Sequence, residues 1–189
     1  MNVLLLDNYD SFTYNIIYKL RSIGVNYTIL QNDCSLQDIK TTKFTHLIVS
    51  PGPSSPKESG ISLQAIAYFA PIVPILGICL GHQCIAEVFG GEVNKMKTPI
   101  HAKSSTLSFI PDPLFKGIKQ NLRIALYHSL HVTNPGECKI LGFSKEGIVM
   151  ALRHRKYPCY GIQFHPESIL QQQGRKIIKN FLSMRIGDS

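Results

Sequence analysis

The sequence has 189 residues, of which 44% are hydrophobic and 17% are charged, and its formal net charge is +8. This composition excludes a disordered chain and predicts a single folded domain over residues 1–189. The apolar runs are too short to cross a bilayer, and the basic residues form only small groups without interleaved aromatic residues, so we expect neither a membrane span nor a nucleic-acid partner.

The first half of the chain alternates strand and helix signals. Residues 2–6 are apolar and reach Asp7 without a basic leader, which favours a first core strand over a signal peptide. Further strands are predicted at 26–30, 45–50 and 73–77, and helices at 11–23, 61–70 and 80–89. This order predicts an α/β fold with a mostly parallel central sheet and helices on both faces.

The second half is dominated by short β-like runs, at 106–110, 122–126, 139–144, 148–154 and 159–163. We expect these runs to flank the parallel sheet with antiparallel strands. A last helix is predicted over 173–184, because Ile177, Ile178, Phe181 and Leu182 would share one face.

The cysteines favour a reducing compartment. They number five, are widely spread and include no CxxC pair, so a disulfide framework is not expected. A zinc site built from Cys79, His82, Cys84 and His101 would match no familiar ligand spacing. We therefore expect no metal, and the absence of GxxxxGK[ST] and GxGxxG motifs leaves no nucleotide cofactor to predict.

The segment from residue 73 to residue 86 is the most informative part of the sequence. An apolar run ends at Gly77-Ile-Cys79-Leu-Gly81 and passes directly into a helix-forming stretch. This is the layout of a nucleophile elbow with cysteine in place of serine. The amino end of the helix would favour the Cys79 thiolate. The alternative is a buried structural cysteine in a strand–helix turn.

A nucleophilic cysteine needs a base, and the base needs an orienting partner. His165 follows an apolar strand, and Glu167 lies two residues further on. In extended backbone these two side chains would point the same way, so Glu167 could hold one ring nitrogen while the other faces Cys79. The alternative is a strand-end histidine beside a surface glutamate.

Acyl transfer also needs hydrogen-bond donors for an oxyanion. The Leu80 amide follows the nucleophile, and Gly52 carries the only N–H in Pro51-Gly52-Pro53. Gln83 lies one helical turn after Cys79 and could bind a polar substrate. Segment 127–131, which includes Ser129 and Leu130, follows a predicted strand and could supply backbone contacts.

Taken together, three motifs resemble those of the class I (triad) glutamine amidotransferase family. PGP at 51–53, GICLGHQ at 77–83 and GIQFHPES at 161–168 occur in the family's order. LDNYDSFTYN at 6–15 and YHSL at 127–130 are similar to one branch, the glutaminase subunits of anthranilate synthase and aminodeoxychorismate synthase. The resemblance covers most of the chain.

The resemblance implies a role for each candidate residue. Cys79 would be the nucleophile, His165 the base and Glu167 its orienter. The Gly52 and Leu80 amides would form the oxyanion hole. The residues that would contact glutamine are Gln83, Ser129 and Leu130. Attack by the Cys79 thiolate would form a γ-glutamyl thioester, release ammonia and then yield glutamate on reaction with water.

The resemblance also implies a partner. Because the chain ends soon after its last motif, we expect the ammonia acceptor site to lie on a separate, chorismate-using synthase subunit. That subunit would make anthranilate for tryptophan synthesis or aminodeoxychorismate for folate synthesis, in a cytoplasm or a plastid stroma. Two alternatives are a stand-alone γ-glutamyl cysteine hydrolase and a regulatory subunit without turnover.

The sequence departs from this branch at two positions. Ser54 follows PGP where the branch usually has glycine, and His101-Ala102-Lys103 replaces the usual His-Gly-Lys. We expect Ser54 to stiffen the oxyanion loop. Ala102 would be strained if its backbone needs a positive φ.

Overall fold

The computed structural model describes residues 1–171 and 173–187, without the side chains of 97–103. The helices are α1 (Thr13–Ile23), α2 (Leu36–Thr41), α3 (Ser62–Phe69), α4 (Leu80–Val88) and α5 (Gly174–Leu182), with short 3-10 helices η1 (Pro56–Glu58) and η2 (Pro113–Phe115). The strands are β1 (Asn2–Asp7), β2 (Asn26–Gln31), β3 (His46–Val49), β4 (Ile75–Ile78), β5 (Glu92–Phe109), β6 (Leu122–Asn134), β7 (Cys138–Ser144), β8 (Val149–His154) and β9 (Cys159–Ile162).

The strands of the described residues form one sheet, in the order β2-β1-β3-β4-β9-β8-β7-β5-β6. Neighbours from β2 to β9 pair in parallel. Every neighbouring pair from β9 to β6 is antiparallel. The predicted α/β fold, with a parallel centre and flanking antiparallel strands, is confirmed.

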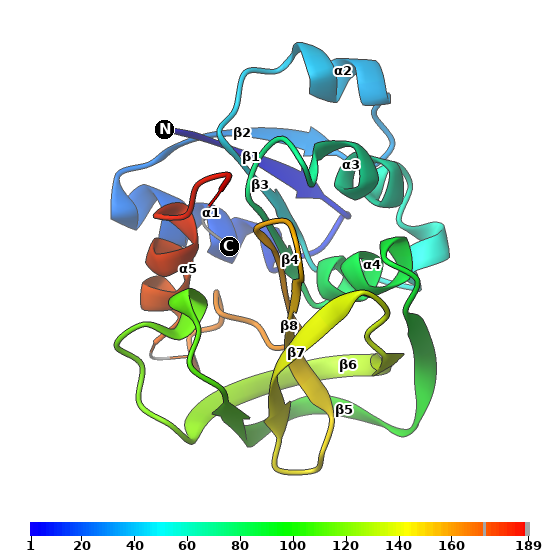
Figure 1. Cartoon of the computed structure of the whole chain (residues 1–189), viewed down its shortest axis with the longest axis vertical. Coiled ribbons are helices and arrows are strands. Elements are labelled where there is room, and N and C mark those ends of the chain that lie inside the picture. Colours follow the sequence, from blue (N-terminus) through cyan, green and yellow to red (C-terminus); the bar gives the residue numbers. More distant parts are fainter. Residues whose placement is uncertain (172, 188–189) are drawn as a thin grey trace.

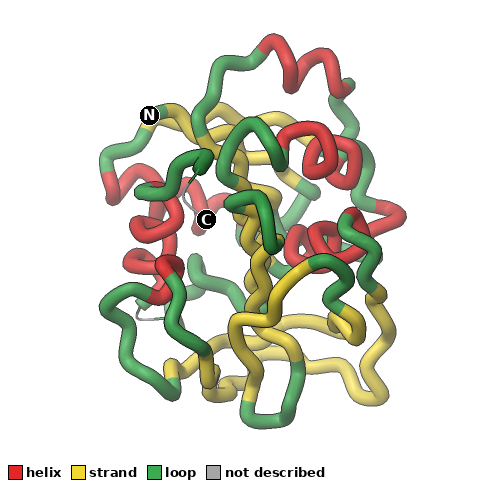
Figure 2. Tube along the Cα trace, viewed as in Figure 1, coloured by secondary structure: helices red, strands yellow, loops and turns green. Residues whose placement is uncertain are grey.

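Helices cover both faces of the parallel half of the sheet (Figure 1). Helices α1 and α5 contact each other on one face, while α3 contacts both α2 and α4 on the other. Figure 2 shows these helices as red coils on either side of the yellow strands. The carboxyl ends of β3, β4 and β9 then meet at one edge, where open α/β sheets place their ligands.

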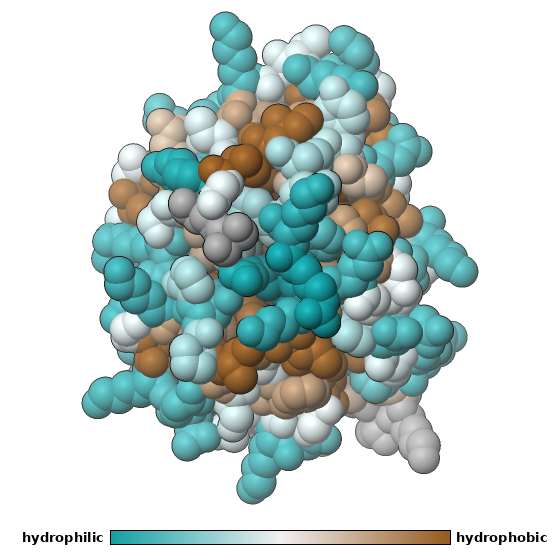
Figure 3. All heavy atoms as spheres, in the orientation of Figure 1, coloured by the Kyte–Doolittle hydropathy of each residue, from teal (hydrophilic) through white to brown (hydrophobic). Residues whose placement is uncertain are grey.

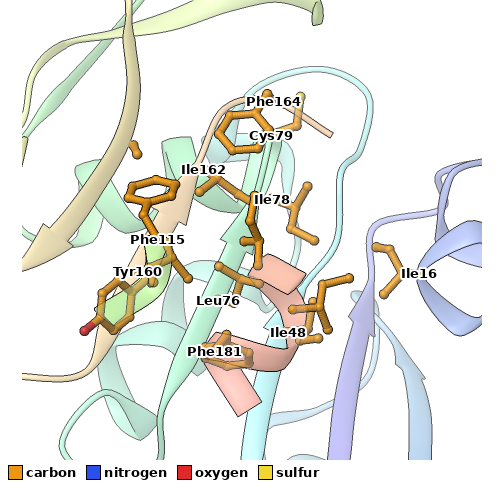
Figure 4. Close-up of a cluster of buried hydrophobic side chains, with 14 of the residues drawn as sticks. Ile16, Ile48, Leu76, Ile78, Cys79, Phe115, Tyr160, Ile162, Phe164 and Phe181 are labelled. Carbon is orange, nitrogen blue, oxygen red and sulfur yellow. The ribbon is translucent and has the colours of Figure 1, made fainter. Parts of the chain in front are cut away.

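Two buried apolar layers result from this arrangement. Along β1, Val3 and Leu5 join the layer under α1 and α5, whereas Leu4 and Leu6 join the layer under α3 and α4. This division follows from the alternation of side chains along a strand. Figure 4 shows the first layer, in which Cys79 lies at one end beside Phe164. The candidate nucleophile therefore rests on the core.

Strands β5 and β6 are much longer than predicted, because only 106–110 and 122–126 carry an apolar pattern. They pair with each other along most of their length, with register shifts between Lys95 and Lys103. Cross-strand hydrogen bonds, not apolar alternation, extend these strands. The prediction that segment 127–131 follows a strand is therefore wrong, since this segment lies inside β6.

Helix α2 was not predicted, although its start carries a recognisable signal. The Ser35 side chain accepts from the Asp38 backbone N–H, and the Asp38 carboxylate accepts from the Ser35 backbone N–H. This reciprocal capping box satisfies amides that would otherwise be unpaired. Only Ile39 of α2 is buried, so the helix has no apolar periodicity to reveal it.

The surface is mixed in character. Figure 3 shows apolar side chains in separate patches among hydrophilic ones on one face. Within residues 1–171 and 173–187, no helix has both the length and the apolar character needed to span a membrane. All five cysteines are free thiols.

Candidate active site

Cys79 occupies a sharp turn between β4 and α4, as the Gly-x-Cys-x-Gly spacing predicts. Its backbone has φ +53° and ψ −100°, a conformation that non-glycine residues rarely adopt. Such strain costs about 1–3 kcal/mol and persists only where the surroundings enforce it. One such restraint is the hydrogen bond from the Cys79 backbone N–H to the Ile162 carbonyl oxygen of β9, at 2.8 Å.

The two flanking glycines make this turn possible. A β-carbon on Gly77 would collide with the Gly81 carbonyl group and lie 2.7 Å from the Ile85 side chain. A β-carbon on Gly81 would collide with the Val49 carbonyl oxygen on β3. Strand and helix therefore approach so closely that no side chain fits at either position.

His165 and Glu167 are joined by a short hydrogen bond. The His165 Nδ1–H donates to Glu167 Oε1 at 2.6 Å, and both side chains are about 98% buried. The reason given for this contact from the sequence is wrong, because β9 ends at Ile162 and residues 166–167 form a turn. The turn, and not extended backbone, brings the carboxylate back to the ring.

His165 is electrostatically coupled to Cys79. Burial lowers the pKa of His165, but the interactions with Cys79 and Glu167 outweigh it and raise the pKa to about 10. Phe12 and Tyr127 pack against the ring, with centroid distances of 4.8 and 5.3 Å. Because Glu167 holds Nδ1, Nε2 is the ring nitrogen left for proton transfer.

A small pocket opens beside the Cys79 sulfur, with a volume of about 120 Å³. The pocket brings together segments that are far apart in the sequence: the loop after β3, the start of α4 and the middle of β6. Its lining includes every residue expected to bind glutamine or its oxyanion, together with the candidate nucleophile: Gly52, Cys79, Leu80, Gln83, Ser129 and Leu130. The arrangement can hold a small polar molecule against a thiol.

Comparison with known proteins identifies the family. The family described as glutamine amidotransferase class-I matches residues 4–184 of this chain. The chain belongs to this family. In this class-I amidotransferase, the three motifs predicted from the sequence lie together at the carboxyl edge of the parallel strands.

Individual relatives resemble the amidotransferase over nearly its whole length. The aminodeoxychorismate/anthranilate synthase component 2 of Bacillus subtilis is 43% identical over 95% of each chain. The anthranilate synthase component 2 of Cyanidium caldarium is 40% identical over 98% of this chain and 100% of that protein. A solved glutamine amidotransferase structure from Thermotoga maritima covers 100% of this chain and 99% of its own, with a TM-score of 0.77; at 16% identity, it shows the fold alone.

Asn8 holds the loop that carries Gly52, a role that the sequence did not reveal. Its backbone N–H donates to Ser50 Oγ at 2.8 Å, and its side-chain amide donates to the Ser50 carbonyl oxygen at 3.0 Å. Asn32 and Ser62 in turn donate to Asn8 Oδ1. The only available signal was the position of Asn8 in the LDNYDSFTYN motif, to which no contact could be assigned.

Ser54 adopts a positive φ of +66° in the same loop. Because a left-handed backbone is costly for a side chain other than glycine, we expect Ser54→Gly to raise the free energy of unfolding by about 0.5–1 kcal/mol. Urea denaturation measures this change. The control is Ser55→Gly, which should lower stability, because Ser55 is extended with φ −127°. A stability loss at both positions would contradict the strain assigned to Ser54.

Two hypotheses from the sequence involve residues 97–103, whose side chains lie outside those that the structure describes. They are the strain at Ala102 and a zinc site that would include His101. The strain expected at Ala102 therefore stays a prediction. Among the fully described residues, no group of three or more His, Cys, Asp or Glu side chains is placed to hold a metal ion.

Two buried histidines predict that the amidotransferase loses stability in acid. Burial lowers the pKa of His82 from 6.5 to about 3 and that of His128 from 6.5 to about 4. Below pH 6.5 the unfolded chain therefore binds protons at these two histidines that the folded chain does not bind. The stability that the neutral imidazoles contribute is complete above pH 6.5 and is lost as pH falls toward the lowered pKa values.

His82→Leu tests this acid sensitivity. In the unsubstituted protein, His82 alone should remove up to about 1.4 kcal/mol of stability for each pH unit below 6.5. We expect His82→Leu to lose less stability than the unsubstituted protein between neutral and mildly acidic pH. Urea denaturation at both pH values gives the difference, and equal losses in the two proteins would refute the effect.

Proposed function

We propose that this amidotransferase hydrolyses glutamine to glutamate and ammonia through a γ-glutamyl thioester on Cys79. The ammonia is delivered to a separate synthase subunit that converts chorismate to anthranilate. One observation carries the proposal: a strained cysteine lies beside a small polar pocket and is coupled to an imidazole whose other nitrogen is held by a buried carboxylate.

The first half-reaction follows from these positions. The Cys79 thiolate attacks the side-chain carboxamide carbon of glutamine, and the Gly52 and Leu80 amides stabilise the negative oxygen that develops. The His165 imidazolium donates its Nε2 proton to the departing nitrogen, so ammonia leaves. General acid catalysis is typically worth about 10²–10⁴ in rate, and each oxyanion donor about 10²–10³.

The second half-reaction regenerates the enzyme. His165, now neutral, removes a proton from water as the water oxygen attacks the thioester carbonyl. The carbon–sulfur bond breaks, glutamate leaves, and the thiolate–imidazolium pair is restored. Glu167 keeps Nδ1 protonated throughout, so Nε2 alone transfers protons. The contacts proposed to orient glutamine are Gln83, Ser129 and Leu130, all of which line the pocket.

The proposed partner follows from the relatives. Both curated relatives described above are named as component 2 of a synthase, which supports a second polypeptide as the ammonia acceptor. We propose that residues 1–189 act as one glutaminase domain of such a complex, in a reducing compartment such as a cytoplasm or plastid stroma. The double name of the Bacillus subtilis relative supports aminodeoxychorismate synthesis as an alternative or additional role.

Affinity purification of the tagged chain from its source cells tests the partner. We expect co-purification of a chorismate-using subunit, and the purified complex should form anthranilate from chorismate and glutamine. Formation of aminodeoxychorismate alone would move the role to folate synthesis. Full glutamate release by the isolated chain, without any partner, would instead indicate a stand-alone hydrolase.

A further inference from the structure

Gln163 contacts the reactive sulfur directly. It lies one residue beyond β9 and its side chain is fully buried. Its Nε2 donates to Cys79 Sγ at 3.5 Å, which is a normal distance for a hydrogen bond to sulfur. Neither the proposed mechanism nor the motif analysis gives this residue a role.

A chain of donors and acceptors fixes which end of the Gln163 amide faces the sulfur. The Leu130 carbonyl oxygen can only accept, so the Gln83 group 3.2 Å away must be Nε2. Gln83 Nε2 donates again to Gln163 Oε1 at 3.1 Å. Flipping Gln163 would place two NH₂ groups against each other, and therefore its own NH₂ must point at Cys79.

We propose that Gln163 is a positioning residue that stabilises the thiolate form of Cys79 and aims its sulfur, with Gln83 and the Leu130 carbonyl locking the amide in place. The inference deepens the proposed function and rests on Cys79 being the nucleophile. A buried N–H donor stabilises a neighbouring anion more than the neutral thiol, because hydrogen bonds to charged groups are the stronger ones.

The same contacts couple the substrate pocket to the sulfur. Both hydrogens of Gln83 Nε2 are used, by Leu130 and Gln163, so only Gln83 Oε1 remains to bind a ligand. It can only accept, which suits the ammonium group of an amino acid. A ligand that binds Gln83 and shifts its side chain would therefore change the position of the Gln163 amide and, through it, the hydrogen bond to Cys79.

The test measures the ionisation of the thiol itself. The rate at which iodoacetamide alkylates Cys79 is followed by peptide mass spectrometry from acidic to alkaline pH, in the full chain. In Gln163→Met, which keeps the length but lacks the donor, we expect the midpoint of this pH profile to rise by about one pH unit. Gln163→Glu should raise it further, because a carboxylate repels a thiolate.

Gln171→Met is the matched control. Gln171 is also buried, but its side-chain amide makes no hydrogen bond within the described residues, so its loss should leave the profile unchanged. A Gln163→Met profile that superimposes on that of the unsubstituted protein would overturn the proposal. An equal shift in Gln171→Met would also overturn it, since any buried substitution would then have the same effect.

A second variant covers the case in which Gln163→Met does not fold. Gln83→Met leaves the Gln163 amide in place but removes the contact that orients it, so we expect a smaller shift in the same direction. An unchanged profile in folded Gln83→Met would contradict the proposal that Gln83 holds the Gln163 amide in its orientation. Alkylation needs neither glutamine nor a synthase, so it reports on the sulfur independently of turnover. A midpoint shift combined with no glutamine-dependent activity in the purified complex would refute the proposed function, while the stabilisation of the Cys79 sulfur by Gln163 would still stand.

Discussion

Cys79→Ala is expected to abolish glutamine-dependent product formation by the complex and to leave formation from added ammonium intact. Removing the proposed nucleophile would eliminate the thioester route, and losses of about 10⁴-fold or more are typical of such substitutions. Added ammonium would bypass Cys79, because the proposed acceptor reaction takes place on a separate subunit. This division between two nitrogen sources is specific to an ammonia-delivering subunit.

Both rates are measured on one preparation of the complex, with chorismate and either glutamine or ammonium. Cys34→Ala is the control, since this half-buried thiol follows β2 and does not line the pocket. Parallel loss of both activities in Cys79→Ala would point to a damaged complex or a different role for Cys79. Retention of the glutamine-dependent rate would rule out Cys79 as the nucleophile.

Gly77→Ala is expected to lower the free energy of unfolding by about 3 kcal/mol, because the new methyl group would meet backbone atoms that cannot rotate away. The clash lies between β4 and the Gly81 carbonyl, so relief requires α4 to move away from the sheet. Since α4 begins directly after Cys79, we expect glutaminase activity to fall by about 10²-fold even in the folded protein.

Urea denaturation and glutaminase assays measure the two effects of Gly77→Ala. Gly147→Ala is the control, because Gly147 has φ +80° but no atom within 4 Å of the added carbon. Only the backbone strain of about 1 kcal/mol is expected there, without loss of activity. Equal stability losses in the two variants would show that the close approach at Gly77 does not matter.

The sequence predicted the parallel half of the fold well, because buried strands and amphipathic helices leave strong apolar patterns. It predicted the turn at Cys79 for a similar reason, since the glycines at 77 and 81 have a local steric cause. Strands β5 and β6 escaped prediction because polar residues joined by cross-strand hydrogen bonds leave no such pattern. The long-range pairing of β5 with β6 decides their length.

The candidate site shows the same division. The residues that line the pocket were all found in local motifs, whereas Asn8 and Gln163 stand in quoted motifs but could not be given a role from them. Asn8 acts on a loop 42 residues away, and Gln163 lies 84 residues from the cysteine that it contacts. No local pattern encodes such distances. For His165 and Glu167, the sequence predicted the contact but gave the wrong backbone geometry for it.

The positive φ at Cys79 has a consequence for how the protein can change over time. Glycine would relieve the strain of this backbone, so replacing Cys79 with glycine should remove that cost to the stability of the folded protein. Thermodynamic stability therefore cannot maintain a thiol at this position. Only selection for the chemistry of Cys79 can keep the thiol there. We expect a lineage that no longer needs this chemistry to replace Cys79 early.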